Sequence, residues 1–247
     1  MISIKYIGSK ARISKQITSI INKLIADNNI NTYIEPFVGG ANVVDKIQCK
    51  NKICGDNNEY LIALWKSLQQ GYQPLEFISR EEYYNIKLNK DSYTKEVVAL
   101  CGILASYNGN WFRAYGGYSP TKTGKDRNYY AEGVRGLMKQ VPKISDVDFR
   151  FCDYKDFSNV KNTLIYCDKP YENTDKCYSD KSFDHNKFWE WVRHMSENNI
   201  VIVSEFNAPN DFTCIWEKEM QITHANQKKK STEKLFINNK IILKILK

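Results

Sequence analysis

The chain has 247 residues, of which 42% are apolar and 26% charged, and its 36 basic against 28 acidic residues give a formal net charge of +8. This length suits one α/β core with a large insertion. The apolar runs and the N-terminal pattern support neither a membrane span nor a secretion signal, so we expect a cytoplasmic protein.

Cysteine and histidine are distributed in a way that predicts neither disulfides nor a metal site. The seven cysteines form no Cys-x-x-Cys pair, and several lie in apolar, strand-like runs, as reduced thiols do. The three histidines are scattered, without the spacing of metal ligands. The basic charge suits a polyanionic partner such as nucleic acid, and equally a basic protein without one.

The first 72 residues alternate between helical and strand patterns. Apolar residues recur with helical spacing over residues 9–26, where Ile13, Ile17 and Ile21 share one face. A strand at 32–34 leads into a glycine turn at 35–40, a helix is expected at 41–48, a strand at 52–55 ends at Asp56, and a helix follows at 59–70. This order predicts a parallel, doubly wound sheet.

The pattern changes at residues 73–147, which we interpret as an insertion. It contains a helix at 96–105 and then a stretch rich in Gly, Tyr, Asn and Lys at 106–133. Strands at 148–152, 163–167 and 200–204, with a helix at 185–199 before the last, resume the sheet. The closing segments, 220–224 and 233–246, predict an antiparallel hairpin around a basic turn at 228–230.

Gly39, Gly40 and Asp56 lie where a parallel sheet binds a nucleotide-like ligand. A glycine turn lets the backbone approach the ligand, and an acid at the end of the next strand can accept hydrogen bonds from a ribose diol. The full dinucleotide fingerprint and a phosphate-loop Lys-Ser/Thr are both missing. The pattern therefore favours a ligand with ribose and no phosphates, such as S-adenosylmethionine.

Residues 166–171 read Tyr-Cys-Asp-Lys-Pro-Tyr after an apolar run, which differs by one residue from the Asp-Pro-Pro-Tyr box of enzymes that methylate exocyclic amino groups of bases. The box occurs in one order with Tyr6-Ile7-Gly8-Ser9-Lys10, Glu35-Pro36-Phe37-Val38-Gly39-Gly40-Ala41, Asp56 and Asp153-Tyr154. Together these motifs resemble the Dam family of DNA adenine methyltransferases, over most of the chain.

The resemblance implies a Rossmann-like, S-adenosylmethionine-dependent methyltransferase sheet with an inserted, mainly helical target-recognition region. Residues 1–72 and 148–247 would form the catalytic domain and 73–147 the insertion. The implied reaction is methyl transfer to N6 of adenine in double-stranded DNA, after the base has been flipped out of the duplex. Such proteins occur in bacteria and phages, alone or beside a cognate restriction endonuclease that acts separately.

Site residues carry over from the matching motifs. The implied cofactor site consists of Tyr6, Lys10, Phe37, Gly39, Asp56, Asp153, Tyr154 and Asp168, with Asp56 on the ribose and Asp153 and Tyr154 beside the adenine. The implied catalytic residues are Asp168, Lys169, Pro170 and Tyr171. Asp168 and the backbone carbonyl of residue 169 would accept the two amino hydrogens, and Tyr171 would stack on the flipped base.

The insertion interleaves aromatic residues with cations and hydrogen-bond donors, a mixture that can stack on bases and neutralise phosphates. We expect DNA contacts from Tyr107, Asn108, Trp111, Arg113, Lys122, Lys125 and Arg127. The family's usual Arg-Tyr-Asn start is Ser106-Tyr107-Asn108 here, so the recognition sequence is not predicted.

Lys169 departs from the family box. It keeps the backbone carbonyl and loses the fixed φ of proline. An ammonium beside Asp168 would compete for its carboxylate and repel a sulfonium by about 2 to 3 kcal/mol at an effective dielectric near 20. We expect a working enzyme whose Lys169 avoids this by turning outward to water or to a DNA phosphate. The alternatives are an impaired homologue that binds DNA or cofactor, or methylation of RNA or of cytosine N4.

Overall fold

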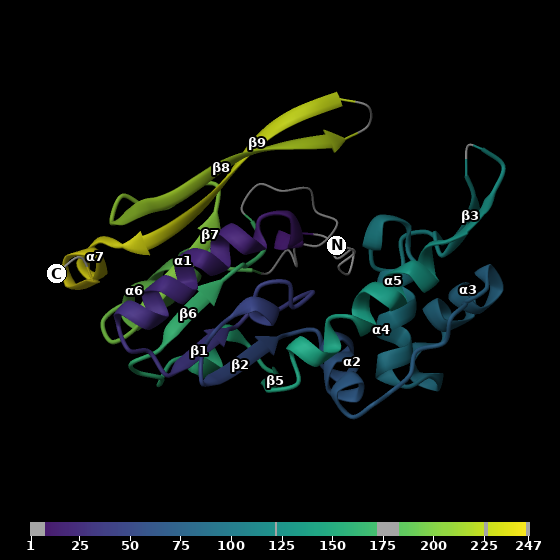
Figure 1. The fold of residues 1–247 in the computed structure, drawn as a ribbon, viewed down its shortest axis with the longest axis horizontal. Helices are drawn as coiled ribbons and strands as arrows, with labels where there is room; N and C mark the ends of the chain where they lie inside the picture. The colour runs from purple at the N-terminus through teal and green to yellow at the C-terminus, as the bar shows by residue number, and fades with distance from the viewer. Residues whose placement is uncertain (1–7, 122, 172–182, 225–226, 246–247) are drawn as a thin grey trace.

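The computed structural model describes residues 8–121, 123–171, 183–224 and 227–245, and its centre is a seven-stranded sheet (Figure 1). The strand order is β5-β2-β1-β6-β7-β9-β8, with the first five strands parallel and the last two antiparallel. The strands are β1 (Thr32–Glu35), β2 (Asn51–Asp56), β5 (Val147–Phe151), β6 (Leu164–Cys167), β7 (Ile200–Glu205), β8 (Phe212–His224) and β9 (Gln227–Asn238). The fold is α/β and Rossmann-like, as predicted.

Strand β1 lies between β2 and β6, where the strand order reverses. Tyr33 on β1 pairs with Lys52 on β2 and with Leu164 on β6. In doubly wound sheets ligands bind at such a reversal, outside the carboxyl ends of the strands. The motifs that follow β1, β2 and β6 therefore meet at one edge of the sheet.

Helices cover the sheet and form a second body beside it (Figure 1). The helices are α1 (Ser14–Asp27), α2 (Glu59–Gln69), α3 (Arg80–Leu88), α4 (Lys95–Leu104), α5 (Tyr129–Met138), α6 (His185–Met195) and α7 (Asn239–Ile245). Helices α3, α4 and α5, with the small hairpin β3 (Tyr118–Pro120) and β4 (Asp126–Asn128), lie together beside α2. The sequence pattern did not predict α3 or α5, and the domain boundaries stay a prediction.

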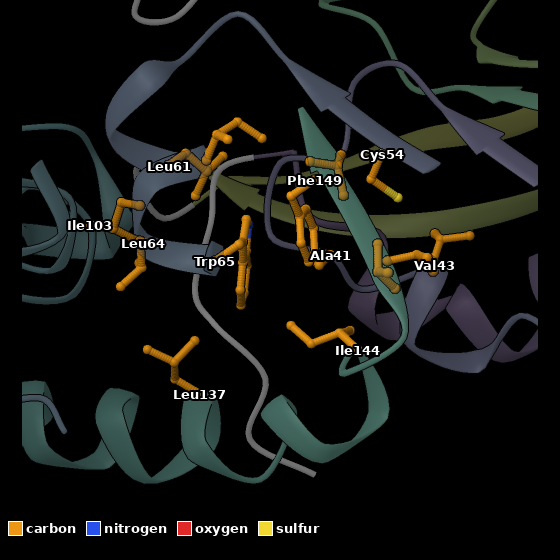
Figure 2. Close-up of a cluster of buried hydrophobic side chains, with 14 of the residues drawn as sticks. Ala41, Val43, Cys54, Leu61, Leu64, Trp65, Ile103, Leu137, Ile144 and Phe149 are labelled. Atoms are coloured by element: carbon orange, nitrogen blue, oxygen red, sulfur yellow. The ribbon is translucent and has the colours of Figure 1, made fainter. Parts of the chain in front are cut away.

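The apolar core extends from the sheet to the helices beside it. Trp65 on α2 is fully buried and stacks on Phe149 of β5, with 5.8 Å between ring centroids, and Ile144 and Leu137 surround them (Figure 2). The Gln140 amide, after α5, donates hydrogen bonds to the carbonyl oxygens of residues 40 and 41, at 3.1 and 2.6 Å. The inserted segment is thus anchored to the glycine turn.

Three local predictions were wrong. The last segment of the hairpin, expected at 233–246, ends at Asn238 and is followed by helix α7. The helix expected at 41–48 is only a 3-10 turn, Val44–Lys46, because Ala41 has a left-handed φ of 51° and the backbone is extended again at Ile47. Val43 and Val44 are β-branched and buried, which also disfavours a helix. The lysines at 228–230 lie within β9 instead of forming the turn, since His224 pairs with Gln227.

The described residues contain neither a helix of membrane-spanning character nor a cluster of metal-binding side chains. No helix there is long and apolar enough to cross a membrane. No group of three His, Cys, Asp or Glu side chains there is arranged to hold a metal ion.

Candidate active site

Lys10 and Asp168 form a buried ion pair at the reversal point of the sheet. Ser9 caps the 3-10 turn Lys10–Arg12, and the Lys10 ammonium lies 2.8 Å from Asp168 Oδ1, with the two side chains 5% and 18% exposed. Burial raises the pKa of Asp168, and Lys10 opposes that rise. Burial likewise raises the pKa of Glu35, at the end of β1, well above its usual range.

Tyr171 is fixed beside this ion pair. The Lys10 ammonium lies 4.5 Å from the centre of its ring, and the ring of Phe206 meets it edge-to-face at 4.7 Å. The phenol is hydrogen-bonded to Ser204 Oγ at 2.7 Å and donates to Glu233 Oε2 at 2.8 Å. The aromatic residue of the box is therefore held by strands β7 and β9.

Lys169 does not turn outward, which corrects the expectation from the sequence. Its side chain is fully buried and forms an ion pair with Glu205, the last residue of β7. The ammonium also lies 5.5 Å from the ring centre of Phe188 on α6. Lys169 is thus paired with Glu205, while Asp168 is paired with Lys10.

Gly39 and Asp56 meet as the sequence predicts. The backbone N–H of Gly39 donates to Asp56 Oδ2 at 3.0 Å, and that of Asn58 donates to Asp56 Oδ1 at 2.9 Å. Burial raises the pKa of Asp56 to about 6, against these two bonds. A carboxylate has about four acceptor sites. Each Asp56 oxygen can therefore accept a further bond, as a ribose diol would require.

Phe37 and Tyr154 also come together, and Asp153 has a local role. The two rings stack with their centroids 5.6 Å apart, and Phe188 and Trp191 pack around Tyr154. Burial raises the pKa of the Tyr154 phenol to about 12. Asp153 is exposed and caps the following 3-10 turn by accepting from the N–H of Lys155 at 3.0 Å. Its place beside an adenine remains a prediction.

The charge balance of the site fits a cationic cofactor. Three carboxyl groups, those of Asp168, Glu205 and Glu233, surround the two ammonium groups of Lys10 and Lys169, and Asp56 adds a fourth carboxyl to the site, so acidic groups outnumber basic ones. A sulfonium carries one positive charge. Together with the open acceptor sites of Asp56, this balance makes the residues present compatible with S-adenosylmethionine.

The expected DNA contacts divide into exposed and packed residues. Tyr107 is 62% exposed, and Asn108, Arg113 and Lys125 are exposed too. Trp111 is half-buried against Tyr60, with ring centroids 5.7 Å apart, and its ring covers Gly102 of α4. Its expected role as a DNA contact is therefore weakened, because packing accounts for its position.

Arg127 has a partner within the insertion. It forms two hydrogen bonds to the carboxylate of Glu132, at 2.7 and 2.8 Å, and covers the ring of Tyr129. A phosphate would have to compete with that carboxylate. Tyr6 and Lys122, two further predicted site residues, lie outside the described part of the chain.

Several residues of the site were not predicted from the sequence, namely His185, Ser204, Glu205, Phe206 and Glu233. Glu205 carried a usable signal. Parallel strands predicted at 163–167 and 200–204 end at one edge of a sheet, so an acid that directly follows the second strand lies near the box. Glu233 carried no such signal, because its position depends on the register of the final hairpin.

Comparisons with known proteins identify the family of the chain. The sequence model of the family described as D12 class N6 adenine-specific DNA methyltransferase matches residues 6–230. The modification methylase StsI of Streptococcus sanguinis is 28% identical over 198 residues, which cover 72% of this chain and 29% of that protein. The type II methyltransferase M.MjaIII of Methanocaldococcus jannaschii is 29% identical over 223 residues, covering 75% of this chain and 74% of that protein.

The chain spans less than a third of the length of the first of these relatives. Among solved structures, a putative RNA methyltransferase from Pyrococcus horikoshii superposes with a TM-score of 0.44 at 8% identity, over 91% of this chain and 82% of that one, which is too distant to inform the site. The family match covers most of the chain and includes every motif of the sheet edge. The chain belongs to the family of D12 class N6 adenine-specific DNA methyltransferases.

Proposed function

We propose that this chain is a site-specific DNA methyltransferase that transfers the methyl group of S-adenosylmethionine to N6 of adenine in double-stranded DNA. The observation that carries the proposal is the Lys10–Asp168 ion pair beside the ring of Tyr171, at the reversal point of the sheet. This arrangement offers an oriented acceptor carboxylate and an aromatic ring in one place. The family membership of the chain supports the same activity.

Asp168 would orient the target amine. An exocyclic amine is a poor nucleophile because its lone pair is delocalised into the ring. Hydrogen bonds from its two hydrogens to Asp168 and to the backbone carbonyl of Lys169 would localise that pair on the nitrogen. Lys10 holds one Asp168 oxygen at 2.8 Å and so fixes the direction of the carboxylate. Orientation of this kind supplies much of the rate where the donor is already activated.

S-adenosylmethionine, when bound, would supply an activated methyl group together with a neutral thioether as leaving group, so the donor needs no further activation by the protein. The new N–C bond leaves a proton to be removed from the nitrogen. Asp168 can hold that proton, because burial raises the pKa of its carboxyl. Asp56 and Gly39 would bind the ribose side of the cofactor, and Phe37 and Tyr154 would form an apolar wall.

The bound base would have to leave the duplex to reach Asp168, and Tyr171 is the ring on which it would stack. Exposed residues of the insertion, Tyr107 and Lys125 among them, would contact the DNA. Since one relative is named a type II methyltransferase, a restriction endonuclease acting as a separate protein is the partner we propose.

The proposal is tested by transfer of labelled methyl from S-adenosylmethionine to unmethylated duplex DNA, with digestion to identify the modified nucleoside. We expect N6-methyladenine from the wild type and a loss of about 1,000-fold or more in Asp168→Ala, since an oriented acceptor is removed. Asp148→Ala, which removes an aspartate that is 53% exposed, serves as the control and should retain full activity. Label in N4-methylcytosine, preferential labelling of an RNA duplex offered in parallel, or equal activity in Asp168→Ala, would refute the proposal.

A further inference from the structure

Lys169 has all of its hydrogen-bonding capacity satisfied inside the protein. An ammonium has three N–H donors. Three acceptors surround this one: the carboxylate of Glu205, Nδ1 of His185 at 3.1 Å and the carbonyl oxygen of Pro170 at 3.3 Å. The side chain is 0% exposed and that of Glu205 is 4% exposed. The odd residue of the box is therefore built into the interior.

Glu205 is anchored as firmly as the lysine. Its Oε2 binds the Lys169 ammonium, and its Oε1 accepts from the backbone N–H of Phe206 at 2.9 Å. Two ions removed from water are costly to the fold unless they are paired and hydrogen-bonded, and the loss of one partner strands the other charge. The two residues are therefore interdependent.

The Lys169–Glu205 pair gives the second ammonium group of the site a carboxylate other than Asp168. Lys10 neutralises Asp168, and Glu205 neutralises Lys169, so each ammonium has its own carboxylate. Without Glu205, the box itself offers Lys169 one other carboxylate, that of its neighbour in sequence, Asp168. That contact would occupy the acceptor that the target amine needs and would place an uncompensated positive charge where a sulfonium binds.

The bond from Lys169 to Pro170 replaces part of what the family proline contributes. A proline at position 169 would fix φ by its ring. Here the side chain of residue 169 reaches the carbonyl of residue 170, and Glu205 holds that side chain in place. The side chain of Lys169 thus restrains the turn that presents the backbone carbonyl of residue 169.

We propose that Glu205 is a positioning residue for methyl transfer, which keeps the Lys169 ammonium away from Asp168 and holds the turn of the box. The inference rests on the proposed function, because it assigns Glu205 a role in the same site. Glu205 acts through Lys169. The pair is reciprocal, so removal of both charges should be tolerated better than removal of either.

The test compares Glu205→Gln, Lys169→Pro and the double variant with the wild type. The first measured quantity is kcat on unmethylated duplex DNA. The second is the affinity for sinefungin divided by the affinity for neutral S-adenosylhomocysteine. Sinefungin is a cofactor analogue that carries an amine in place of the sulfonium methyl. In Glu205→Gln we expect kcat to fall ~10- to 100-fold and the affinity ratio to fall ~10-fold, because one negative charge is lost beside the bound cation. The double variant should recover both to within ~3-fold of wild type, since its net charge is restored.

Asp146→Asn is the matched control. It removes the carboxylate that lies 2.7 Å from the Lys52 ammonium in the wild type. Lys52 is 8% exposed and Asp146 60% exposed, and Lys52 lies at the end of β2 away from Asp56. The control should lose stability while kcat and the affinity ratio stay unchanged. A purely structural Glu205 would behave in the same way, and that outcome would overturn the proposal. A double variant no better than Glu205→Gln would overturn it too.

The affinity ratio separates this inference from the proposed function. If the wild type methylates no DNA but the ratio falls in Glu205→Gln and recovers in the double variant, the proposed activity is wrong and the placement of charge by Glu205 stands. If the ratio is unchanged in Glu205→Gln, the inference fails whatever the turnover.

Discussion

The edge of the sheet and the insertion use charge in opposite ways. At the sheet edge the ammonium groups of Lys10 and Lys169 are buried, and each is paired with its own carboxylate. In the insertion Arg127 and Lys125 are exposed, and the ion pair of Arg127 with Glu132 is open to solvent. Fixed, buried charges suit one small ligand in one orientation. Exposed cations suit a long polyanion, whose affinity depends on salt.

The aromatic residues differ in the same sense. Tyr171 at the edge is held by the two hydrogen bonds of its phenol, to Glu233 and with Ser204, and by the ring of Phe206. In the insertion, Tyr107 is 62% exposed, while Trp111, four residues further along the chain, is packed against Tyr60. The edge is therefore organised before any ligand binds. In the insertion, only some of the aromatic residues that the sequence suggests as DNA contacts are exposed.

Among substitutions that leave Asp168 itself in place, removal of Lys10 should have the largest effect on the edge. In Lys10→Met the carboxylate of Asp168 loses its buried partner, and we expect kcat to fall ~100- to 1,000-fold. Burial raises the pKa of Asp168 and Lys10 opposes the rise, so without Lys10 the pKa rises further. The acid limb of the kcat profile should therefore move to higher pH. The profile is measured from pH 5.5 to 9 on duplex DNA.

Lys52→Met is the matched control for that variant. Lys52 is a buried lysine paired with Asp146, and it lies on β2 at the end away from the site. It should lose stability and keep both kcat and the pH profile. If Lys10→Met behaves like Lys52→Met, the Lys10–Asp168 pair supports only the fold, and the contrast between the edge and the insertion loses its functional meaning.

Asp56 should make stability depend on pH in a way that exposed carboxyls do not. Burial raises its pKa from 3.8 to about 6 in the folded protein. The folded state therefore binds the proton more tightly, and the stabilisation present below pH 3.8 is lost as the pH rises through about 6. That shift corresponds to about 3 kcal/mol. Asp56→Asn cannot titrate, so its stability relative to wild type should rise by about that amount between pH 4 and pH 7.

Urea unfolding of both proteins at pH 4 and pH 7 measures this difference, in which the other titrating groups cancel. Asp27→Asn, at a carboxyl that is 51% exposed, should show no such change relative to wild type. A difference between Asp56→Asn and wild type that stays constant with pH would mean that Asp56 is not held in a buried environment.

The sequence predicted which strand ends form the site better than it predicted the side-chain contacts within the site. Strand ends followed by Asp56 and Asp168 were identifiable because strand patterns are local and parallel strands end at one edge. The inward turn of Lys169 was not, because its direction is decided by Glu205, 36 residues further along the chain. The helix expected at 41–48 failed for a related reason, since buried tertiary contacts and the φ of Ala41 override the local pattern.

Trp111 shows the same limit in the insertion, because its sequence context cannot distinguish a stacking ring from a packing ring. The ring lies where a Cβ on Gly102 would come within 2.6 Å of it, so α4 approaches it as a core neighbour. Aromatic residues interleaved with cations predict nucleic-acid contact only for rings that the fold leaves exposed.

Two single substitutions in the insertion should separate these roles. Tyr107→Ala should weaken binding to duplex DNA ~10-fold, the value of one lost stacking contact, and leave the unfolding midpoint unchanged. Trp111→Ala should lower the free energy of unfolding by about 2 kcal/mol, because it opens a space between α4 and Tyr60. Its affinity for DNA, measured by fluorescence anisotropy on folded protein, should stay within ~2-fold of wild type. The reverse pattern would assign Trp111 to the DNA surface, and the insertion would then be preorganised for its ligand as the sheet edge is.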